Sequence, residues 1–260
     1  MSYETILVEV TDGVATVTFN RPDRMNSFNR TMAHEFRALW NAVRDDPEVR
    51  VIVLRAPPGK AFSTGADVKE GWRAPGERAQ PFNMDDPGEW LGPKSNKVWK
   101  PLIIAVSGMA AGGAFYWLNE ADIIICSEEA TFFDPHVTFG MVSAVEPVGA
   151  MGRISLGQIQ RMVLLGNDER ISAPTALQIG LVTEVTPLDE LWSRAAELAG
   201  LIAAKHPVAI QGTVRAIWES LGLPRSIAVA NALKYTQLGN PISTAEVKRS
   251  DMKTPPWRLR

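Results

Sequence analysis

The sequence predicts an α/β protein in which buried strands alternate with helices. Short apolar runs occur at 49–56, 102–106 and 123–126. Runs of this length with little polar alternation are typical of strands that are buried on both faces of a parallel sheet. Helical patterns lie between and after these runs, as expected when helices connect parallel strands.

The N-terminal segment is expected to form a β-hairpin followed by a helix. Residues 5–10 and 14–20 are rich in β-forming side chains, and they are separated by Asp12-Gly13, a dipeptide that favours a tight hairpin turn. Between 31 and 43, apolar residues recur at spacings of four, three and four. This periodicity predicts a helix with one buried face.

Residues 73–93 interrupt the alternation with several prolines, glycines and acidic residues, and are expected to form a surface loop. Trp72, Trp90 and Trp99 bracket this stretch. These side chains either anchor the loop to the core or form an adaptable wall for an apolar substrate, and the sequence leaves both readings open.

The chain is expected to be helical from Ser155 onward. Apolar residues with helical spacing mark three segments there: 188–202, 210–221 and 227–238. We therefore divide the chain into an α/β core, residues 1–190, and a helical C-terminal region, residues 191–260. Such a region can pack on its own core or on a neighbouring subunit.

The composition is that of an ordinary globular protein. The 260 residues include 45% hydrophobic and 22% charged side chains, with a net charge of -2, so the basic surface that nucleic acid usually requires is missing. No apolar run reaches the roughly 18 residues of a membrane span, and the first residues lack the pattern of a signal peptide. Neither nucleic acid nor a membrane is therefore expected as a partner.

Cys126 is the only cysteine, which excludes an internal disulfide. It lies in an apolar run, so a buried core thiol in a cytoplasmic protein is expected. The three histidines are scattered and, with this cysteine, supply no metal-ligand cluster of recognised spacing. We therefore expect no metal site.

Two glycine-containing turns are the most informative segments for function: Lys60–Asp67 and Ser107–Ala114. Each follows a hydrophobic run and precedes a helix-like run. A helix start leaves backbone N–H groups without partners, and glycine allows a ligand to approach them closely. Two such turns that face each other would form a two-donor oxyanion hole for a carbonyl oxygen that gains negative charge.

Several further motifs accompany these turns in a fixed order: Phe19–Pro22 with Asn26, Ala61–Asp67, Lys100–Gly108, Gly112-Gly113, Ala121–Ile125, Gly166 with Arg170–Ala173, and Ala176–Val182. Taken together, they resemble the crotonase (enoyl-CoA hydratase/isomerase) superfamily over nearly the whole chain. The turns alone would also fit other folds, but they lack the G-x-G-x-x-G run of a dinucleotide-binding protein.

The resemblance implies a spiral of ββα units with a helical C-terminal region, assembled as a homotrimer or as a dimer of trimers. It implies acyl-CoA thioesters as substrates, with coenzyme A as part of the substrate and no permanently bound cofactor. The oxyanion-hole positions of the family fall on the backbone N–H groups of Ala66 and Gly113.

The resemblance also places four residues near coenzyme A: Arg24, Lys60, Ala66 and Asp67. Arg24 and Lys60 would meet its phosphates, although both are otherwise explained as solvated surface cations. Asp67 is equally explained as a carboxylate at the N-terminus of a helix. Basic residues near the C-terminus could add phosphate contacts, on charge alone: Lys248, Arg249 and Lys253.

The chain departs from the hydratases of this family at their two catalytic glutamates, which handle the water and the α-proton. Those positions fall on Tyr116 and His136. His136 is the leading candidate for a catalytic base, because its ordinary pKa suits proton transfer near neutrality; the alternative is a hydrogen-bonded structural histidine. Tyr116 could donate a proton or position water, or it could simply pack beside its aromatic neighbours.

Two acidic residues are further candidates. Asp134 could orient His136, or it could cap a turn. Glu146 lies between apolar residues and would have a raised pKa if it were buried, which suits an active-site acid; the alternative is an exposed glutamate at a helix start. Glu146 and Tyr116 are therefore expected to assist His136 in catalysis.

The sequence thus predicts an enzyme of the enoyl-CoA hydratase/isomerase type, which stabilises a thioester enolate. Two alternatives stay open. The segment Asp134–His136 also resembles members of the superfamily that cleave a C–C bond of a β-diketone. Alternatively, the chain binds coenzyme A thioesters without hydratase activity.

Overall fold

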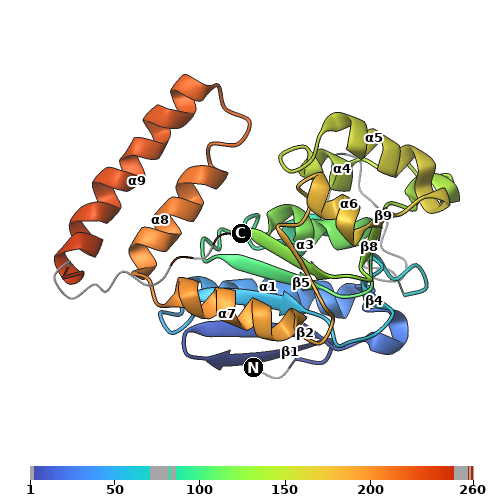
Figure 1. Cartoon of the computed structure of the whole chain (residues 1–260), viewed down its shortest axis with the longest axis horizontal. Helices are drawn as coiled ribbons and strands as arrows, with labels where there is room; N and C mark the ends of the chain where they lie inside the picture. The colour runs from blue at the N-terminus through green and yellow to red at the C-terminus, as the bar shows by residue number, and fades with distance from the viewer. Residues whose placement is uncertain (1–2, 71–81, 83–85, 249–256, 258, 260) are drawn as a thin grey trace. The chain divides into compact units, whose positions relative to one another are not determined.

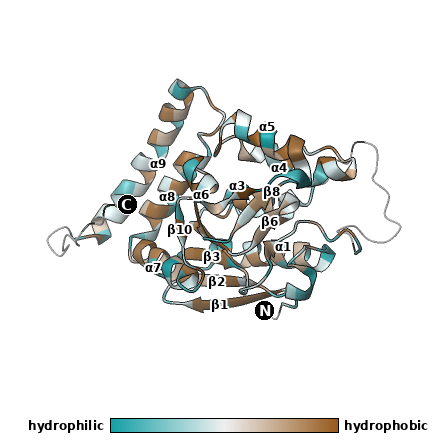
Figure 2. Ribbon diagram, turned by 45° about the vertical axis from the view of Figure 1, so that its right-hand side comes forward, coloured by the Kyte–Doolittle hydropathy of each residue, from teal (hydrophilic) through white to brown (hydrophobic). Residues whose placement is uncertain are grey.

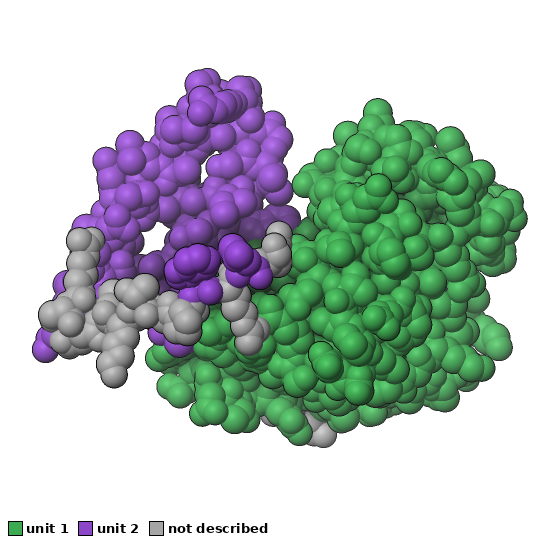
Figure 3. Space-filling model, viewed as in Figure 1, with its two compact units in different colours: residues 1–203 green, residues 204–260 purple. Residues whose placement is uncertain are grey.

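The computed structural model describes residues 3–70, 82, 86–248, 257 and 259. The chain divides into two compact units, 1–203 and 204–260, which are coloured separately in Figure 3. Most of the loop expected at 73–93 lies outside the described residues. Its described C-terminal part contains a short helix, α2 (Gly88–Leu91).

A six-stranded sheet forms the base of the first unit (Figure 1). Its strands, in spatial order, are β1 (Ile6–Thr11), β2 (Val14–Phe19), β3 (Val51–Arg55), β5 (Leu102–Val106), β7 (Ile123–Ser127) and β10 (Glu184–Thr186). The first two strands form the expected antiparallel hairpin across Asp12-Gly13. The other neighbours are parallel, as the continuous apolar runs predicted.

A second sheet consists of four short strands. Its strands are β4 (Ala61–Ser63), β6 (Met109–Ala111), β8 (Thr131–Phe133) and β9 (Ile171–Ser172). The chain passes from β3 to β4, from β5 to β6 and from β7 to β8, and helical segments follow each pair. This repeated passage between two sheets is the expected spiral of ββα units.

Helices cover the sheets of the first unit: α1 (Arg30–Asp45), α3 (Phe115–Glu120), α4 (Val145–Ala150), α5 (Leu156–Leu165), α6 (Ala173–Gln178) and α7 (Leu191–Ala203). Short 3-10 segments connect them to the strands: η1 (Pro22–Arg24), η2 (Gly112–Ala114), η3 (His136–Phe139) and η4 (Gly166–Asp168). The helix expected at 31–43 is α1. Its N-terminal cap is Asn29, whose side chain accepts a hydrogen bond from the Met32 N–H.

The core lies on both faces of the six-stranded sheet. Along β3, Val51 and Val53 face one cluster, to which α7 contributes, and Ile52 and Leu54 face the other, which includes α1. This division follows from the period-two alternation of side chains along a strand. In Figure 2 the strands β1 to β3 are accordingly largely brown. Cys126 is fully buried as expected, and burial raises the pKa of its thiol to about 12.

Two details differ from the sequence expectation. The chain is not helical throughout after Ser155, because β9 and β10 interrupt it; both strands are too short to give a periodic signal. In addition, α7 packs on the six-stranded sheet as part of the first unit, whereas the division at residue 190 assigned it to the C-terminal region. Its small residues Ala195 and Ala199 permit this close approach to the strands.

The described part of the second unit contains two helices that pack against each other, α8 (Pro207–Trp218) and α9 (Arg225–Glu246). His206 precedes α8, and its Nε2 lies 2.8 Å from the Glu246 carboxylate at the end of α9. Among the described residues, no helix combines the length and hydrophobicity that a membrane crossing requires.

Candidate active site

The candidate active site lies where three parallel strands of the four-stranded sheet end. β4 is followed by the turn that contains Ala66, β6 by Gly113, and β8 by His136. The carboxyl ends of parallel strands meet at one edge of a sheet, and ligands of open α/β folds bind outside this edge. The topology therefore brings together residues that lie far apart in the sequence.

The two glycine turns are in direct contact. Gly65 has a φ of +79°, and a Cβ on it would lie 2.6 Å from the Gly113 nitrogen. A Cβ on Gly113 would in turn lie 3.2 Å from the Gly65 Cα and 2.7 Å from the Phe28 ring. Only glycine fits at both positions, so the two turns meet, which is the condition that a two-donor oxyanion hole requires.

The backbone N–H of Ala66 points away from the neighbouring segment that contains Phe28. Ala66 pairs with Phe28 in a parallel bridge, in which the Phe28 N–H donates to the Gly65 carbonyl and the Asp67 N–H donates to the Phe28 carbonyl. In such a bridge the flanking residues make both bonds, and the N–H of the central residue faces the opposite side.

Gly113 lies in the first turn of a helical stretch, formed by η2 and continued by α3. No side chain caps η2, and the N–H of its C-cap residue Phe115 donates to the Gly112 and Gly113 carbonyls. The N–H groups of a first helical turn have no intrahelical acceptor. This geometry fits the second donor of the predicted oxyanion hole.

His136 stands beside the second glycine turn and is held by Asp134. Its Nδ1 lies 2.6 Å from the Asp134 Oδ1, and its backbone N–H donates to the same oxygen at 3.0 Å. A Cβ on Gly112 would lie 3.5 Å from the His136 Cε1. The hydrogen bond to Asp134 raises the pKa of His136, although burial opposes it. The carboxylate therefore orients the imidazole and favours its protonated form.

Asp134 is fully buried, and it also accepts a hydrogen bond from the Ser143 hydroxyl at 2.8 Å. Burial alone would raise the pKa of Asp134, but the hydrogen bonds from His136 outweigh it and the pKa is lowered. Asp134 thus stays ionised beside the imidazole, as expected for a residue that orients it.

Glu146 faces the other nitrogen of the same imidazole. Its Oε1 lies 3.7 Å from the His136 Nε2, and its side chain is only 8% exposed. Burial raises the pKa of Glu146 above its ordinary value, so the expectation of a buried acid fits better than that of an exposed helix-start glutamate. Asn119 donates a hydrogen bond to the Glu146 carbonyl at 2.7 Å and fixes the start of α4.

Tyr116 lies on α3, next to these residues. Its hydroxyl donates a hydrogen bond to the Asp86 Oδ2 at 3.0 Å, and its ring packs edge-on against Phe28. Burial, together with the charges of Glu146 and Asp86, raises the pKa of Tyr116 far above its usual range. The phenol therefore stays protonated and is both packed and hydrogen-bonded.

The predicted coenzyme A residues are divided between two environments. Arg24 and Lys60 are both exposed. Their segments are neighbours, since the Asn26 side chain donates a hydrogen bond to the Ala61 carbonyl. Asp67 is buried and paired with Arg21 at 3.1 Å. Lys248 is exposed.

The Asp67 carboxylate also accepts two backbone N–H bonds, from Lys69 and Glu70. Burial would raise its pKa, but these bonds and the pairing with Arg21 lower it. The two backbone bonds close a turn at residues 68–70, and the alternative of a carboxylate at a helix N-terminus stays a prediction. Arg249 and Lys253, proposed to add phosphate contacts, lie outside the described residues. In the part of the chain that the structure describes, no group of three potential ligands could hold a metal ion.

Sequence reasoning missed two residues of this site. Asp86 lies in the stretch that is expected to form a surface loop, and no local pattern connects it with Tyr116, 30 positions away. Ser143 precedes Glu146 by three positions and carries no pattern of its own. Its distance from Asp134 in the sequence gave no signal of their contact.

The fold and this site define a protein of the crotonase type, with two sheets in a ββα spiral and polar residues at the strand ends. The sequence model of the family described as "Enoyl-CoA hydratase/isomerase" matches residues 9–212. The chain therefore belongs to the enoyl-CoA hydratase/isomerase family.

Individual relatives agree with this assignment. The chain is 34% identical over 211 residues to the (E)-benzylidenesuccinyl-CoA hydratase of Thauera aromatica, covering 81% of each chain. It is 30% identical over 256 residues to the short-chain-enoyl-CoA hydratase of Clostridium acetobutylicum, covering 95% of this chain and 93% of the relative. A crystal structure of an enoyl-CoA hydratase/isomerase from Mycobacterium paratuberculosis superimposes with a TM-score of 0.84 at 32% identity over 100% of both chains.

Proposed function

We propose that this enzyme adds water to an enoyl-CoA thioester, or catalyses the reverse reaction, through a thioester enolate. The observation that carries the proposal is the meeting of three features at one edge of the four-stranded sheet. These are the two glycine turns, the Asp134–His136 pair and the buried carboxyl group of Glu146.

The backbone N–H groups of Ala66 and Gly113 are proposed to bind the thioester oxygen. When a nucleophile adds to the β-carbon, or when the α-proton leaves, negative charge develops on this oxygen. Two fixed donors stabilise that charge without reorganisation, and removing one such donor costs about 2.7–4 kcal/mol in comparable enzymes. The exposed cations Arg24 and Lys60 are proposed to meet the phosphates of coenzyme A.

His136 and Glu146 are proposed to share one catalytic proton. In hydration, Glu146 accepts a proton from water, the water oxygen bonds to the β-carbon, and the π electrons move onto the thioester. The imidazolium of His136 then gives its proton to the α-carbon. In the reverse direction His136 removes the α-proton as a base. Such a pair titrates with two macroscopic pKa values, so activity should follow a bell-shaped pH profile.

This proposal is tested by the hydration of trans-2-enoyl-CoA substrates of increasing chain length. The reaction is measured as the loss of the absorbance of the conjugated thioester. We expect turnover by the wild type and a loss of at least about 100-fold in His136→Ala, since general acid–base catalysis typically contributes this much. His34→Ala is the matched control, because His34 is exposed on α1. Binding of the thioesters without turnover would contradict the hydratase proposal.

A second candidate function is hydrolysis of a C–C bond between two carbonyl groups. It is favoured by the Asp134–His136 pair, which can activate water for attack on a ketone carbon as well as on an alkene. Turnover of a cyclic β-diketone in the absence of coenzyme A, by a protein that leaves enoyl-CoA unchanged, would favour this function. Binding without either reaction would favour a non-catalytic relative.

A further inference from the structure

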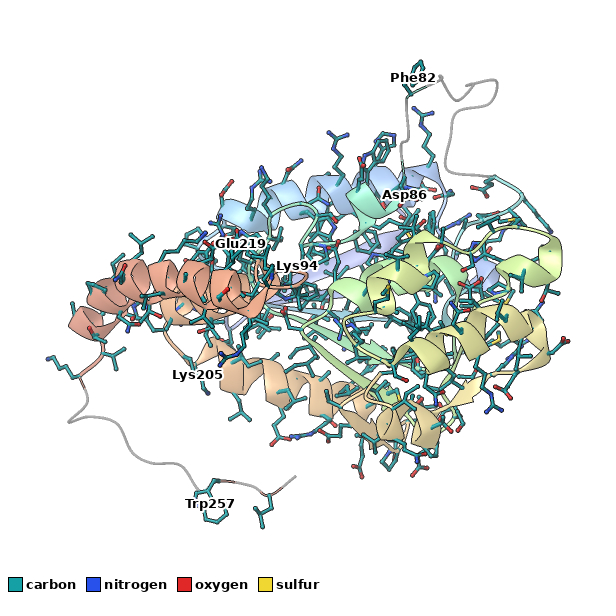
Figure 4. All side chains as sticks on the ribbon, turned by 90° about the horizontal axis from the view of Figure 1, so that it is seen from above. Phe82, Asp86, Lys94, Lys205, Glu219 and Trp257 are labelled. Carbon is teal, nitrogen blue, oxygen red and sulfur yellow. The ribbon has the colours of Figure 1, made fainter. Side chains whose placement is uncertain are left out.

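Asp86 is fixed by two hydrogen bonds that use both oxygens of its carboxylate. Oδ1 accepts the Gly88 N–H at 2.8 Å, at the start of α2, and Oδ2 accepts the Tyr116 hydroxyl at 3.0 Å. Asp86 is labelled in Figure 4, at the end of the segment that leads into α2. A carboxylate held in this way has a defined orientation, so the direction of the Tyr116 hydroxyl is defined as well.

The ring of Tyr116 is held equally firmly. It packs against Phe28, with ring centroids 6.1 Å apart. On another side, a Cβ on Gly88 would lie 2.6 Å from its Cδ1, so the ring rests directly on the glycine backbone. The phenol therefore cannot swing away from Asp86 without disturbing the start of α2.

A tyrosine hydroxyl has one proton to donate and oxygen lone pairs that accept. Because Asp86 takes the only proton of Tyr116, the phenol oxygen can act toward any other group only as an acceptor. Glu146 also acts on Tyr116, because its charge raises the pKa of the phenol, and it is a second acceptor when it is ionised. The site thus presents two acceptors, of which Glu146 lies 3.7 Å from the His136 Nε2.

We propose that Asp86 and Tyr116 position the water molecule that attacks the substrate, with Tyr116 as its second acceptor and Asp86 as a positioning residue. This proposal rests on the hydration function above. A water molecule that donates one O–H to Glu146 and the other to Tyr116 has a lone pair left for the β-carbon. During the attack, the water proton that points to Glu146 moves onto this carboxylate. The hydrogen bond to Tyr116 meanwhile holds the water oxygen in place.

Asp86→Asn is the sharpest test. It replaces the acceptor of the Tyr116 hydroxyl with a donor, while the contact with the Gly88 N–H can be kept. The asparagine Oδ1 can still accept the Gly88 N–H, which turns its NH2 group toward the Tyr116 oxygen. The phenol then has to direct its proton elsewhere, toward the water or Glu146. Glu89→Gln is the matched control: it removes a carboxylate from the same segment, but Glu89 is exposed on α2.

Two reactions of each variant should be compared. Hydration of an enoyl-CoA requires the positioned water, whereas exchange of the α-protons of a saturated acyl-CoA with deuterium oxide requires only the enolate and His136. We expect Asp86→Asn to lose about 100-fold in hydration, the typical cost of misplacing a reacting group, with α-proton exchange changed less than twofold. In a Tyr116→Phe background, Asp86→Asn should have less than a twofold further effect on hydration.

The pH profile gives an independent readout. The titratable groups that act on one another here are Asp86, Tyr116, Asp134, His136 and Glu146. The charge of Asp86 raises the pKa of Glu146, so Asp86→Asn should move the low-pH limb of hydration to lower pH. A low-pH limb that stays in place would show that Asp86 does not act on Glu146.

Unchanged hydration in Asp86→Asn would overturn the proposal, and so would an equal loss of hydration and exchange. A wild type that exchanges α-protons but does not hydrate would also overturn it, while leaving the enolate site intact. A wild type that does neither would instead contradict the proposed function itself.

Discussion

At the scale of single residues, the site is a chain of polar groups that control one another's protonation. Asp134 holds the Nδ1 side of His136, and Glu146 faces its Nε2 side. Both carboxyl groups are buried, yet the pKa of Asp134 is lowered and that of Glu146 is raised. The difference arises because Asp134 receives strong hydrogen bonds, whereas desolvation dominates at Glu146. Two carboxyl groups in different environments can therefore take different roles.

Replacing Asp134 with asparagine should move the high-pH limb of the activity profile to lower pH. Asp134 raises the pKa of His136 above 6.5, and hydration requires the imidazolium, so activity falls as pH rises through this pKa. Without the carboxylate, the pKa returns toward its ordinary value and the fall begins earlier. The measurement is kcat against pH. A high-pH limb that stays in place would show that Asp134 does not set the protonation of His136.

The same pair links pH to stability. A histidine with a raised pKa stabilises the fold fully below 6.5, and this contribution is lost as pH rises through the raised pKa. The lowered pKa of Asp134 stabilises the fold above 3.8, and this contribution is lost as pH falls through the lowered pKa. Asp134→Asn should therefore be most destabilising at pH values between the two folded-state pKa values, as urea unfolding at several pH values would show.

Gly65→Ala should abolish most activity by separating the two glycine turns. The new Cβ would lie 2.6 Å from the Gly113 nitrogen, at a φ of +79°. Gly222→Ala is a matched control, since its φ is +77° and nothing lies within 4 Å of its Cβ position. Both variants carry a backbone strain of about 1–2 kcal/mol, but only Gly65→Ala should lose about 100-fold in kcat. Equal activity losses in the folded variants would argue against the oxyanion hole.

At the scale of elements, the site depends on which strand ends come together. The apolar runs of β3, β5 and β7 were predictable, because strands buried on both faces leave a strong signal. The strands β4, β6 and β8 have three residues each, too few for any periodic signal, and the sequence showed only the glycine turns after two of them. Motif resemblance, rather than periodicity, therefore placed Ala66, Gly113 and His136 in one site.

Asp86 could not be predicted for a different reason. Its role depends on a contact with Tyr116 on another element, and neither residue has a local pattern that reveals the other. By contrast, Glu146 was predictable as a candidate because apolar neighbours indicate burial, and burial of a carboxyl group indicates a shifted pKa. What the sequence encodes locally can be read from it, whereas pairing across the fold cannot.

Lys100→Met should destabilise α1 at its C-terminal end. The buried Lys100 ammonium donates to the Val43 and Asp46 carbonyls, where the last helical carbonyls have no intrahelical partner. Methionine keeps the apolar stem but leaves these carbonyls without the donor, at a cost of about 1–3 kcal/mol. Urea unfolding measures this loss, and Lys69→Met, at an exposed lysine, should change stability by less than about 0.5 kcal/mol.

At the scale of the whole molecule, the two units differ in how they are stabilised. The first unit has a large core on both faces of its sheet. In the second unit, α8 has no buried residue, and Ser243 is the only buried residue of α9. Large apolar side chains are instead exposed along these helices: Ile217, Ile227, Val229, Leu233, Leu238 and Ile242. Two helices of this size do not supply a sufficient core by themselves.

A groove of about 670 Å³ lies between α8 and α9 and is lined mainly by apolar residues. We propose that other copies of the chain cover these helices in a homotrimer or a dimer of trimers. Burying an exposed leucine contributes about 1.5–3 kcal/mol, so several of them per subunit can sustain such an assembly. The expected mass in solution is then three or six times 28.5 kDa.

Leu233→Lys combined with Leu238→Lys should dissociate this assembly. Both side chains are more than half exposed in the single chain, so the new charges would have to be buried between subunits. Gln237→Lys adds a charge at an exposed polar position of the same helix and should leave the mass unchanged. Sedimentation equilibrium measures the mass of each. A wild type that sediments as a monomer would contradict the assembly, and the apolar faces of α8 and α9 would then have to be covered within one chain.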